Sequence, residues 1–453
     1  MMAGRYKAYD KLSSTREVII EDFPEHWALT RIKFNSLVKA RVGWHGLKSD
    51  DFTEVGPYLV TGSDFKGKFI QWKNCYHCDE ERYEQDPYIQ LTNGDLLITK
   101  DGTIGKVALV SQLNGKATLN SGVFVVRPLR SDYTTKYYYW LLLSRAFTDF
   151  VDYYKTGSTI AHLYQETFVN FKYPLPLYEE QQKIASFLDH ETAKIDTLIA
   201  KQEKLIELLK EKRQAVISHA VTKGLNPNAP MRDSGVEWLG EVPEHWFVVP
   251  IKRMCEVKDG THDTPKYLDK GENSFPLITS KDFEGKNISF ESAKYISKEA
   301  HREIVKRSNT EVGDVLMSMI GGNIGKALIV KETAEFSIKN VALFKTTRKS
   351  ALASYILYYL ESGLLDIQIS LQSRGGAQGF LSLGDLRNLV FFKVPEDELN
   401  TIVEHLDLKI SKYDRLINIA SDKIALLSER KTALISAAVT GKIDVRDWKP
   451  QGV

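Results

Sequence analysis

Apolar residues recur every three or four positions from Glu179 to Thr222, a stretch that contains neither proline nor glycine. This spacing predicts an amphipathic helix with one apolar stripe. Lys223, Gly224 and Pro227 follow the stretch, as expected where a helix ends. At ~1.5 Å per residue the helix would be roughly 65 Å long. Such a long, narrow stripe needs a second long helix to cover it.

A second stretch, from Glu398 to Thr440, supplies that partner. Asp189 matches Asp407, and Ser218 matches Ser436, in both cases 218 positions later. We therefore predict two long helices that form an antiparallel coiled coil. The predicted helix–helix packing positions are Ile184, Leu188, Ile195, Leu198, Leu205, Leu209, Val216, Ile410, Leu416, Ile417, Ile424, Leu427 and Leu434.

The repeat extends well beyond these helices. FPEHWALTRIK at 23–33 returns as VPEHWFVVPIK at 242–252, 219 positions later, and GDLLITKDGTIGK at 94–106 returns as GDVLMSMIGGNIGK at 313–326. Short β-branched runs between Gly and Asp predict strands and turns, and residues 135–154 and 350–371 are predicted to be helical. Each copy is therefore an α+β globule followed by a long helix. Antiparallel packing of the helices would relate the copies by a pseudo-two-fold axis.

These patterns predict six segments. They are a first globule at 1–177, a long helix at 178–224, a linker at 225–241, a second globule at 242–396, a second long helix at 397–441, and a C-terminal tail at 442–453.

The composition is that of an ordinary globular protein, with 43% hydrophobic and 26% charged residues. The formal net charge of +2 does not by itself indicate nucleic-acid binding, so a DNA surface would have to be a local patch or be shared with partners. Three cysteines suggest a reducing compartment. The N-terminus lacks the apolar core of a signal peptide, and no apolar run is long enough to span a bilayer. We expect a cytoplasmic protein.

Motifs that would indicate catalysis fail on inspection. The turn from Gly102 to Lys106 has the wrong spacing for a phosphate-binding loop. Cys75 and Cys78 have no second cysteine pair to complete a zinc site. The histidines of the repeated PEHW motif are better explained by packing. We therefore predict no catalytic residue, no metal ligand and no cofactor in this chain.

The order of globule, long helix, globule and long helix resembles the specificity subunit of type I restriction-modification enzymes. The motifs that carry the resemblance are the repeated PEHW, the GDLLITKDGTIGK stretch, the TGST and RGGA turns, EEQQKIASFLD at 179–189, and SGVEWLGEVPEHW at 234–246. The chain departs from the pattern at 10–22, where the expected copy of the lead-in at Ser234 is replaced. It departs again at Asn400-Thr401, where the first copy has Gln-Gln.

The resemblance implies a function in DNA recognition. The globules would be target recognition domains that each read half of a split, asymmetric site in double-stranded DNA, and the helices would set the gap between the halves. Two methylation subunits that modify adenine would dock on this chain, and motor-nuclease subunits would join where present. S-adenosylmethionine, ATP and Mg would then belong to those partners.

Side chains that could contact DNA are expected in loops that differ between the copies, because base reading needs donors and acceptors and phosphate contacts need cations. In the first copy these are Trp44, His45, Lys48, Thr61, Ser63, Lys66, Lys68, Lys100, Lys106, Ser158, Thr159 and His162. In the second copy they are Lys258, Thr261, His262, Lys266, Thr279, Ser280, Lys281, Lys286, Asn323, Lys326, Arg374 and Gln378.

Two other interpretations are considered. A non-catalytic adaptor whose two globules bind proteins would fit the same architecture, and it would not shift DNA in a mobility assay. A complete single-chain restriction enzyme is disfavoured because the methyltransferase and nuclease motifs are missing.

Overall fold

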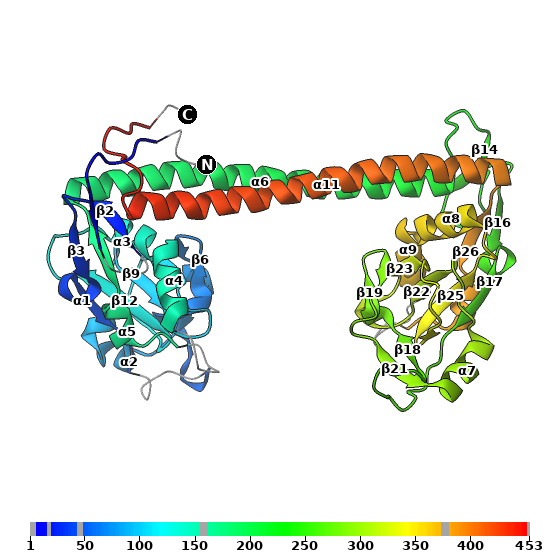
Figure 1. The fold of residues 1–453 in the computed structure, drawn as a ribbon, viewed down its shortest axis with the longest axis horizontal. Coiled ribbons are helices and arrows are strands. Elements are labelled where there is room, and N and C mark those ends of the chain that lie inside the picture. Colours follow the sequence, from blue (N-terminus) through cyan, green and yellow to red (C-terminus); the bar gives the residue numbers. More distant parts are fainter. Residues whose placement is uncertain (1–5, 16–19, 43–48, 155–161, 373–379, 451–453) are drawn as a thin grey trace. The chain divides into compact units, whose positions relative to one another are not determined.

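The computed structural model describes residues 6–15, 20–42, 49–154, 162–372 and 380–450. The chain divides into two compact units, the first formed by Met1–Glu203 with Asp422–Val453 and the second by Lys204–Ser421. Each unit contains one β-rich globule together with the beginning of one long helix and the end of the other (Figure 1).

The two long helices are α6 (Tyr178–Lys223, 46 residues) and α11 (Glu396–Val439, 44 residues). In the first unit, Ile184 and Leu188 of α6 share a core with Leu434 of α11, and Lys431 Nζ lies 2.6 Å from Asp196 Oδ1.

In the second unit, Ile217 of α6 shares a core with Ile410 of α11, and Arg213 Nε lies 2.9 Å from Asp414 Oδ1. Residue numbers that rise along α6 therefore meet numbers that fall along α11, so the helices pack antiparallel. The predicted α+β class with two packed long helices is confirmed.

The buried positions of the helices differ from the predicted set at three places. Leu198, Leu205 and Leu416 remain 41%, 42% and 40% exposed. Each belongs to a doublet of adjacent apolar residues, and the neighbouring residue, Ile199, Ile206 or Ile417, is the less exposed member. The reason is geometric, because a helix turns by about 100° per residue and two adjacent side chains cannot both face the same partner. The other predicted packing positions are buried or partly buried.

The first globule is built on a six-stranded sheet. Its strands lie in the order β4 (Ser36–Lys39), β12 (Val123–Pro128), β9 (Leu96–Thr99), β10 (Val107–Leu109), β7 (Phe69–Ile70) and β6 (Phe65–Lys66). Three smaller sheets pair β11 (Ala117–Leu119), β5 (Thr53–Val60) and β8 (Tyr76–His77); β13 (Lys172–Leu175) and β3 (Ala28–Arg31); and β1 (Leu12–Ser14) and β2 (Asp22–Pro24). Its helices are α1 (Ile32–Asn35), α2 (Glu80–Glu84), α3 (Thr135–Leu142), α4 (Arg145–Tyr154) and α5 (Gln165–Val169).

The second globule repeats this plan. Its main sheet has the order β17 (Glu256–Asp259), β25 (Val341–Lys345), β22 (Val315–Ser318) and β23 (Ala327–Ile329). The smaller sheets are β21 (Lys294–Ser297), β18 (Ser274–Ile278) and β24 (Ser337–Ile338); β19 (Phe283–Glu284) and β20 (Asn287–Ile288); β16 (Phe247–Pro250) and β26 (Val390–Lys393); and β14 (Met231–Asp233) and β15 (Glu241–Pro243). Its helices are α7 (Lys298–Arg307), α8 (Ser350–Glu361), α9 (Leu364–Gln372) and α10 (Leu383–Arg387).

Each helical segment predicted between the sheet and the last strand is in fact two helices. The break follows Leu142 in the first copy and Glu361 in the second. At both breaks a serine hydroxyl donates to a carbonyl three residues earlier, Ser144 to Leu141 and Ser362 to Tyr359, each at 2.6 Å. Such a side-chain bond competes with the helical ladder and ends the helix.

The PEHW motif holds the start of the long helix that follows it. In the first unit His26 Nε2 and Trp27 Nε1 lie 2.9 and 3.1 Å from Glu180 Oε2, and Tyr9 Oη donates to the other carboxylate oxygen at 2.5 Å. In the second unit His245 and Trp246 meet Glu398 in the same way, at 2.7 and 2.9 Å. The packing role predicted for the two histidines therefore has a definite partner.

The altered lead-in of the first copy keeps the backbone arrangement of the second. Leu12 pairs with Pro24 between β1 and β2, and Met231 pairs with Pro243 between β14 and β15. The corresponding residues of the two pairs are 219 positions apart in the sequence. At the end of α11, Gly441 has φ +75°, and a Cβ there would lie 2.1 Å from Pro24 Cδ. This close approach explains why glycine ends that helix.

Candidate nucleic-acid interface

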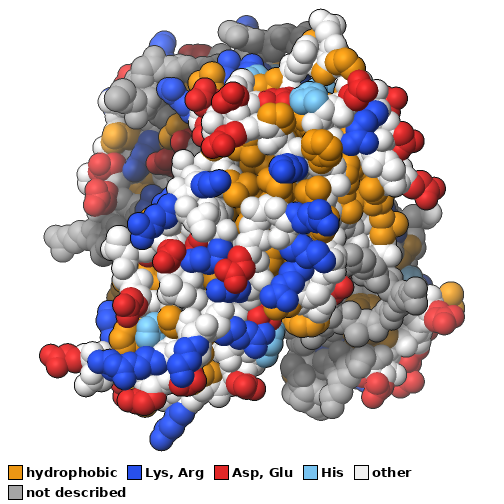
Figure 2. All heavy atoms as spheres, turned by 90° about the vertical axis from the view of Figure 1, so that its right-hand side faces the viewer, with side chains coloured by type: hydrophobic (Ala, Val, Ile, Leu, Met, Phe, Trp, Pro, Cys, Tyr) orange, Lys and Arg blue, Asp and Glu red, His pale blue; other side chains and the backbone are white. Residues whose placement is uncertain are grey.

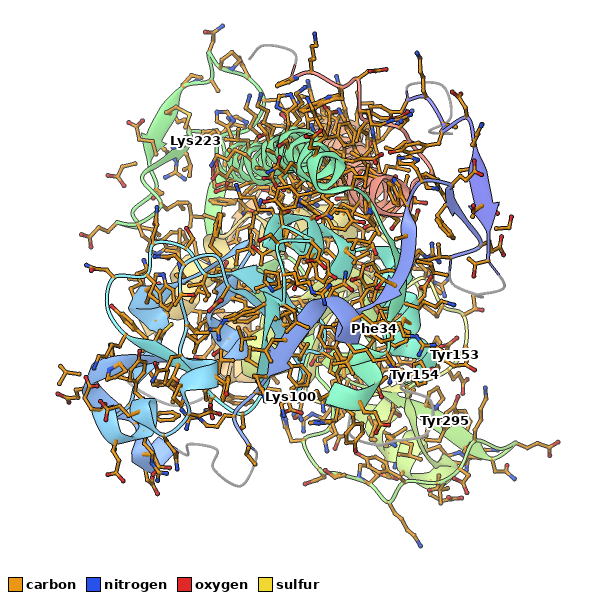
Figure 3. The ribbon with its side chains drawn as sticks, turned by 90° about the vertical axis from the view of Figure 1, so that its left-hand side faces the viewer. Phe34, Lys100, Tyr153, Tyr154, Lys223 and Tyr295 are labelled. Carbon is orange, nitrogen blue, oxygen red and sulfur yellow. The ribbon has the colours of Figure 1, made fainter. Side chains whose placement is uncertain are left out.

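In the first globule, the turn from β9 to β10 presents two lysines beside a hydrogen-bonded pair of an aspartate and a histidine. Thr99 Oγ1 accepts from the backbone N–H of Lys106 at 2.9 Å, which closes the turn, and the Lys106 side chain is exposed. Lys100 extends its ammonium over the Phe124 ring at 5.4 Å. Figure 3 shows Lys100 in the lower part of this globule, away from the helix pair. The turn is therefore an accessible, basic edge of the sheet.

Asp101 of this turn meets His162, which enters from the chain before α5. The two residues form an isolated antiparallel bridge, and His162 Nδ1 bonds the Asp101 carboxylate. Their side chains are 44% and 30% exposed, and the Tyr164 ring packs edge-on against the imidazole at 4.6 Å. This bond uses one ring nitrogen of His162 and one carboxylate oxygen of Asp101. The other nitrogen and the other oxygen can therefore bond a ligand.

In the second globule the corresponding bridge joins Ile320 and Phe380. Beside it lies a polar cluster at the end of β17. The buried carboxylate of Asp259 accepts from Arg307 Nε at 2.9 Å and bonds His262 Nε2 at 2.9 Å. His262 Nδ1 in turn lies 2.9 Å from Asn340 Oδ1. Both ring nitrogens of His262 are thus engaged, so this imidazole joins the end of β17 to Asn340, and Asp259 adds Arg307 to the cluster.

Three of the residues predicted to contact DNA make hydrogen bonds within the globules. Thr61 and Thr279 are the N-caps of equivalent 3₁₀ turns, where their hydroxyls donate to Asp64 and Asp282 at 2.9 and 2.8 Å. Ser63 lies 2.7 Å from the Thr61 hydroxyl. These turns have the same form in both copies, so they are less suited to reading two different half-sites.

Two of the lysines predicted to contact DNA make contacts with other residues of this chain. Lys68 pairs with Asp189 of α6 and lies over the rings of Tyr139 and Trp140 at 5.3 and 5.5 Å. Lys326 donates to the backbone carbonyl of Phe283.

The remaining described positions of the second copy lie at the surface. Lys258 pairs with Glu256 at 3.2 Å, and the backbone of Thr261 bridges to Lys339. Ser280 is partly exposed, and the exposed members are Lys266, Lys281, Lys286 and Asn323, as is Lys66 in the first copy. On the side of the second unit drawn in Figure 2, Lys and Arg side chains form a band through the middle, with acidic side chains more frequent toward its edges.

Comparisons with known proteins agree with this architecture. Residues 45–208 match the family model of the type I restriction modification DNA specificity domain. The MjaVIII specificity subunit of Methanocaldococcus jannaschii is 24% identical over 438 residues, which cover 94% of each chain. The EcoBI specificity subunit of Escherichia coli is 24% identical over 364 residues, 79% of this chain and 75% of that one.

Solved structures show the same fold. A chain from a structure of the type I R-M system superposes with a TM-score of 0.69 at 18% identity, covering 93% of this chain and 99% of that chain. The HsdS subunit from Thermoanaerobacter tengcongensis gives a TM-score of 0.53 at 18% identity, covering 98% and 100%. The chain belongs to the specificity subunits of type I restriction-modification systems. Such subunits are non-catalytic, and their target recognition domains bind DNA.

Seven of the predicted DNA contacts of this specificity subunit lie outside the described residues: Trp44, His45, Lys48, Ser158, Thr159, Arg374 and Gln378. Of the others, the structure brings Lys100, Lys106 and His162 together at one edge of the first globule. In the second globule it brings Thr261 and His262 to the end of β17.

Sequence reasoning missed the groups that hold these side chains, namely Asp101, Asp259, Arg307, Asn340 and Phe380. Only Asp101 and Phe380 carried a usable signal, since both belong to the Gly-rich stretches that were already recognised as diverged between the copies. Arg307 reaches Asp259 from 48 positions away, a pairing that no local pattern reveals.

Cys75 and Cys78 of the first globule are buried free thiols. Within the described ranges, no three His, Cys, Asp or Glu side chains approach one another as metal ligands would. Burial raises the pKa of the Cys75 thiol to about 12 and that of Cys78 to about 11, so both are protonated at neutral pH. The helices of the described chain include none that is long and apolar enough to cross a membrane.

Proposed function

We propose that this specificity subunit reads a bipartite, asymmetric site in double-stranded DNA, with residues 1–177 and 242–396 as the two target recognition domains. The observation that carries the proposal is the repeat itself. Both globules build the same four-stranded arrangement, β4-β12-β9-β10 in the first and β17-β25-β22-β23 in the second, and the same PEHW–Glu contact. Yet they place different side chains at the turn after the central strand. A shared frame with diverged loops is suited to reading two unlike half-sites.

We further propose that α6 and α11 set the gap between the half-sites. Each helix runs from one unit into the other, so a change in helix length changes what lies between the two reading surfaces. Segments 178–224 and 397–441 would be the spacer, with 225–241 as the linker and 442–453 as the tail.

The proposal includes partners. Two adenine-N6 methyltransferase subunits would dock on this chain, and motor-nuclease subunits would join where present. The repeat supports two docking sites, because equivalent surfaces recur in the two units. S-adenosylmethionine, ATP and Mg would be held by those partners, in a complex expected in the cytoplasm.

The test is to co-express the chain with its methylation subunit and to map N6-methyladenine by single-molecule sequencing. A split motif with a fixed gap is the expected result. An insertion variant would carry four extra residues in each helix, after Glu203 and after Ser421. One extra turn adds ~6 Å, so the gap should grow by about 2 base pairs while both half-sites stay the same.

An unchanged gap in a fully active insertion variant would refute the proposed role of the helices. If the soluble wild-type complex methylates no split motif and shifts no DNA at low salt, the adaptor interpretation is favoured instead.

A further inference from the structure

The bridge after the central strand occupies the same place in both globules. In the first, the backbone N–H of Leu163 donates to Lys100 O at 2.8 Å, and in the second that of Leu381 donates to Met319 O at 3.0 Å. The donors are 218 positions apart and the acceptors 219, which are the offsets of the repeat. Asp101 and His162 therefore correspond to Ile320 and Phe380.

The side chains at this matched place have opposite chemistry. Asp101 and His162 form a partly exposed, hydrogen-bonded polar pair, whereas Ile320 and Phe380 are apolar, and Phe380 is 55% exposed. A large apolar side chain half in water gains little for the stability of the globule, and a partly exposed hydrogen bond between side chains contributes modestly. Ile320 also packs partly against the core of the second unit. At Phe380 and at the Asp101–His162 pair, the difference between the copies is therefore better explained by what the side chains contact than by how each globule folds.

We propose that this bridge is a specificity-determining position in each half-site. Asp101, held by His162, accepts a hydrogen bond from the exocyclic amino group of a cytosine or adenine in the major groove. Ile320 and Phe380 contact the C5-methyl group of a thymine. The inference rests on the proposed function and names the base chemistry that each globule reads.

The chemistry of base edges supports this assignment. Carboxylates accept from the amino group of cytosine, and apolar side chains, phenylalanine among them, recognise the thymine methyl group. Cations that could hold the flanking phosphates lie close by in the chain or in space. They are Lys100 and Lys106 in the first globule. In the second, the His262 ring lies 6.2 Å from that of Phe380, centroid to centroid, with both of its nitrogens engaged within the globule.

The bridge also has room to meet a groove. Gly102 and Gly105 follow Asp101 with φ +66° and +82°, and a Cβ added at either would meet no atom within 4 Å. Gly321 and Gly322 follow Ile320 with equally open surroundings. A turn without side chains beside the bridge lets the backbone come close to a base pair.

The experiment uses the complex of full-length chain and methylation subunit. The wild-type motif is determined first. Asp101→Ile with His162→Phe should then change the preferred base at one position of one half-site only. Ile320→Asp with Phe380→His should change one position of the other half. Each should lower methylation of the wild-type base by roughly ten- to a hundred-fold relative to the new one.

Matched control variants distinguish a change in base recognition from a change in folding or in net charge. Glu166→Gln removes one negative charge from the exposed surface of α5, in the same segment as His162. Val312→Asp places a carboxylate at a 45% exposed site before β22, the strand that leads to Ile320. Both controls should keep the wild-type motif and rate.

The milder variants Asp101→Asn and Phe380→Leu keep the test decisive if a double variant does not fold. Each should relax one base position while the gap and the other half-site are retained. If both methylate the wild-type motif with unchanged base preference and rate, the proposal is wrong and the proposed function stands. If the wild-type complex yields no split motif, it is the proposed function that fails.

Discussion

Trp246 donates its indole N–H to Glu398 at 2.9 Å and thereby ties the entry strand of the second globule to the first turn of α11. Trp27 and Glu180 repeat this contact at 3.1 Å at the start of α6. In each case one carboxylate also bonds the neighbouring histidine. A single acidic side chain therefore orients each long helix on its own globule.

Replacing Glu180 with Ala should destabilise the first unit by about 2–3 kcal/mol, because the buried indole and phenol of Trp27 and Tyr9 would lose a charged acceptor. Urea unfolding monitored by tryptophan fluorescence would measure the change. Glu179→Ala is the matched control, since Glu179 is its exposed neighbour and should change stability by less than about 0.5 kcal/mol. Equal effects of the two substitutions would contradict the contact.

Arg213 and Lys431 occupy equivalent places in the repeat but differ in their ion-pair partners and in their burial. Arg213 pairs with both Asp414 and Glu361 at 2.9 and 2.8 Å and is 18% exposed. Lys431, among the described residues, pairs only with Asp196 and is 30% exposed. Burial would lower the pKa of Arg213, but its hydrogen bonds to the two carboxylates outweigh burial and raise it.

Arg213→Ala should therefore cost about 2–3 kcal/mol, because it leaves the carboxylates of Glu361 and Asp414 without the cation they share. Lys431→Ala should cost less than about 1 kcal/mol. Denaturation of both variants in parallel is the measurement. A larger loss for Lys431→Ala would contradict the stabilising role of the contacts that Arg213 makes with Glu361 and Asp414.

The features predicted correctly from the sequence are those that arise from its internal repeat and from the periodicity of its apolar residues. The long helices, the two-copy plan and the α+β class follow from spacing and self-similarity, which are properties of neighbouring residues and of the chain compared with itself. It failed within apolar doublets, because Leu198 and Ile199 satisfy the same pattern and only the packed structure selects between them.

The residues of the candidate site were harder to predict from the sequence than the fold, because their contacts also depend on the packed structure. Thr61 and Lys68 carry groups that suit DNA, but a capping box and an ion pair with α6 engage them within the globule. Conversely, the bridge between Asp101 and His162 joins residues 61 positions apart, and its counterpart in the second copy has no shared residue type. The two pairs correspond because they occupy the same place in the two globules, and not because they share residue types.

His301 should make the second unit sensitive to acid. Its imidazole is 5% exposed, stacks on Phe275 at 4.0 Å between centroids and lies 2.9 Å from Ser337 Oγ. Burial lowers its pKa below the ordinary 6.5, and Glu335 only partly offsets this. Because the folded state resists protonation, the stabilising contribution is complete above pH 6.5 and is lost as the pH falls through and below that value.

Urea unfolding of the wild type and of His301→Gln between pH 5 and 8 would test this, with the difference between the two shrinking as the pH falls. His405→Gln, at a partly exposed histidine of α11, is the control. A difference between wild type and His301→Gln that does not vary with pH would contradict the prediction.

The doublets of α6 give the sharpest test of how the long helices pack. Ile199 packs against the core of the first unit, whereas Leu198 is 41% exposed. Ile199→Ala should destabilise that unit by about 1–3 kcal/mol, and Leu198→Ala should change its stability by less than about 0.5 kcal/mol, although both remove apolar side chains of nearly equal size. The side chains differ only in which direction the helix points them. If Leu198→Ala were the more costly variant, the orientation of α6 about its axis would be wrong, because a turn of about 100° would bring Leu198 to the buried side.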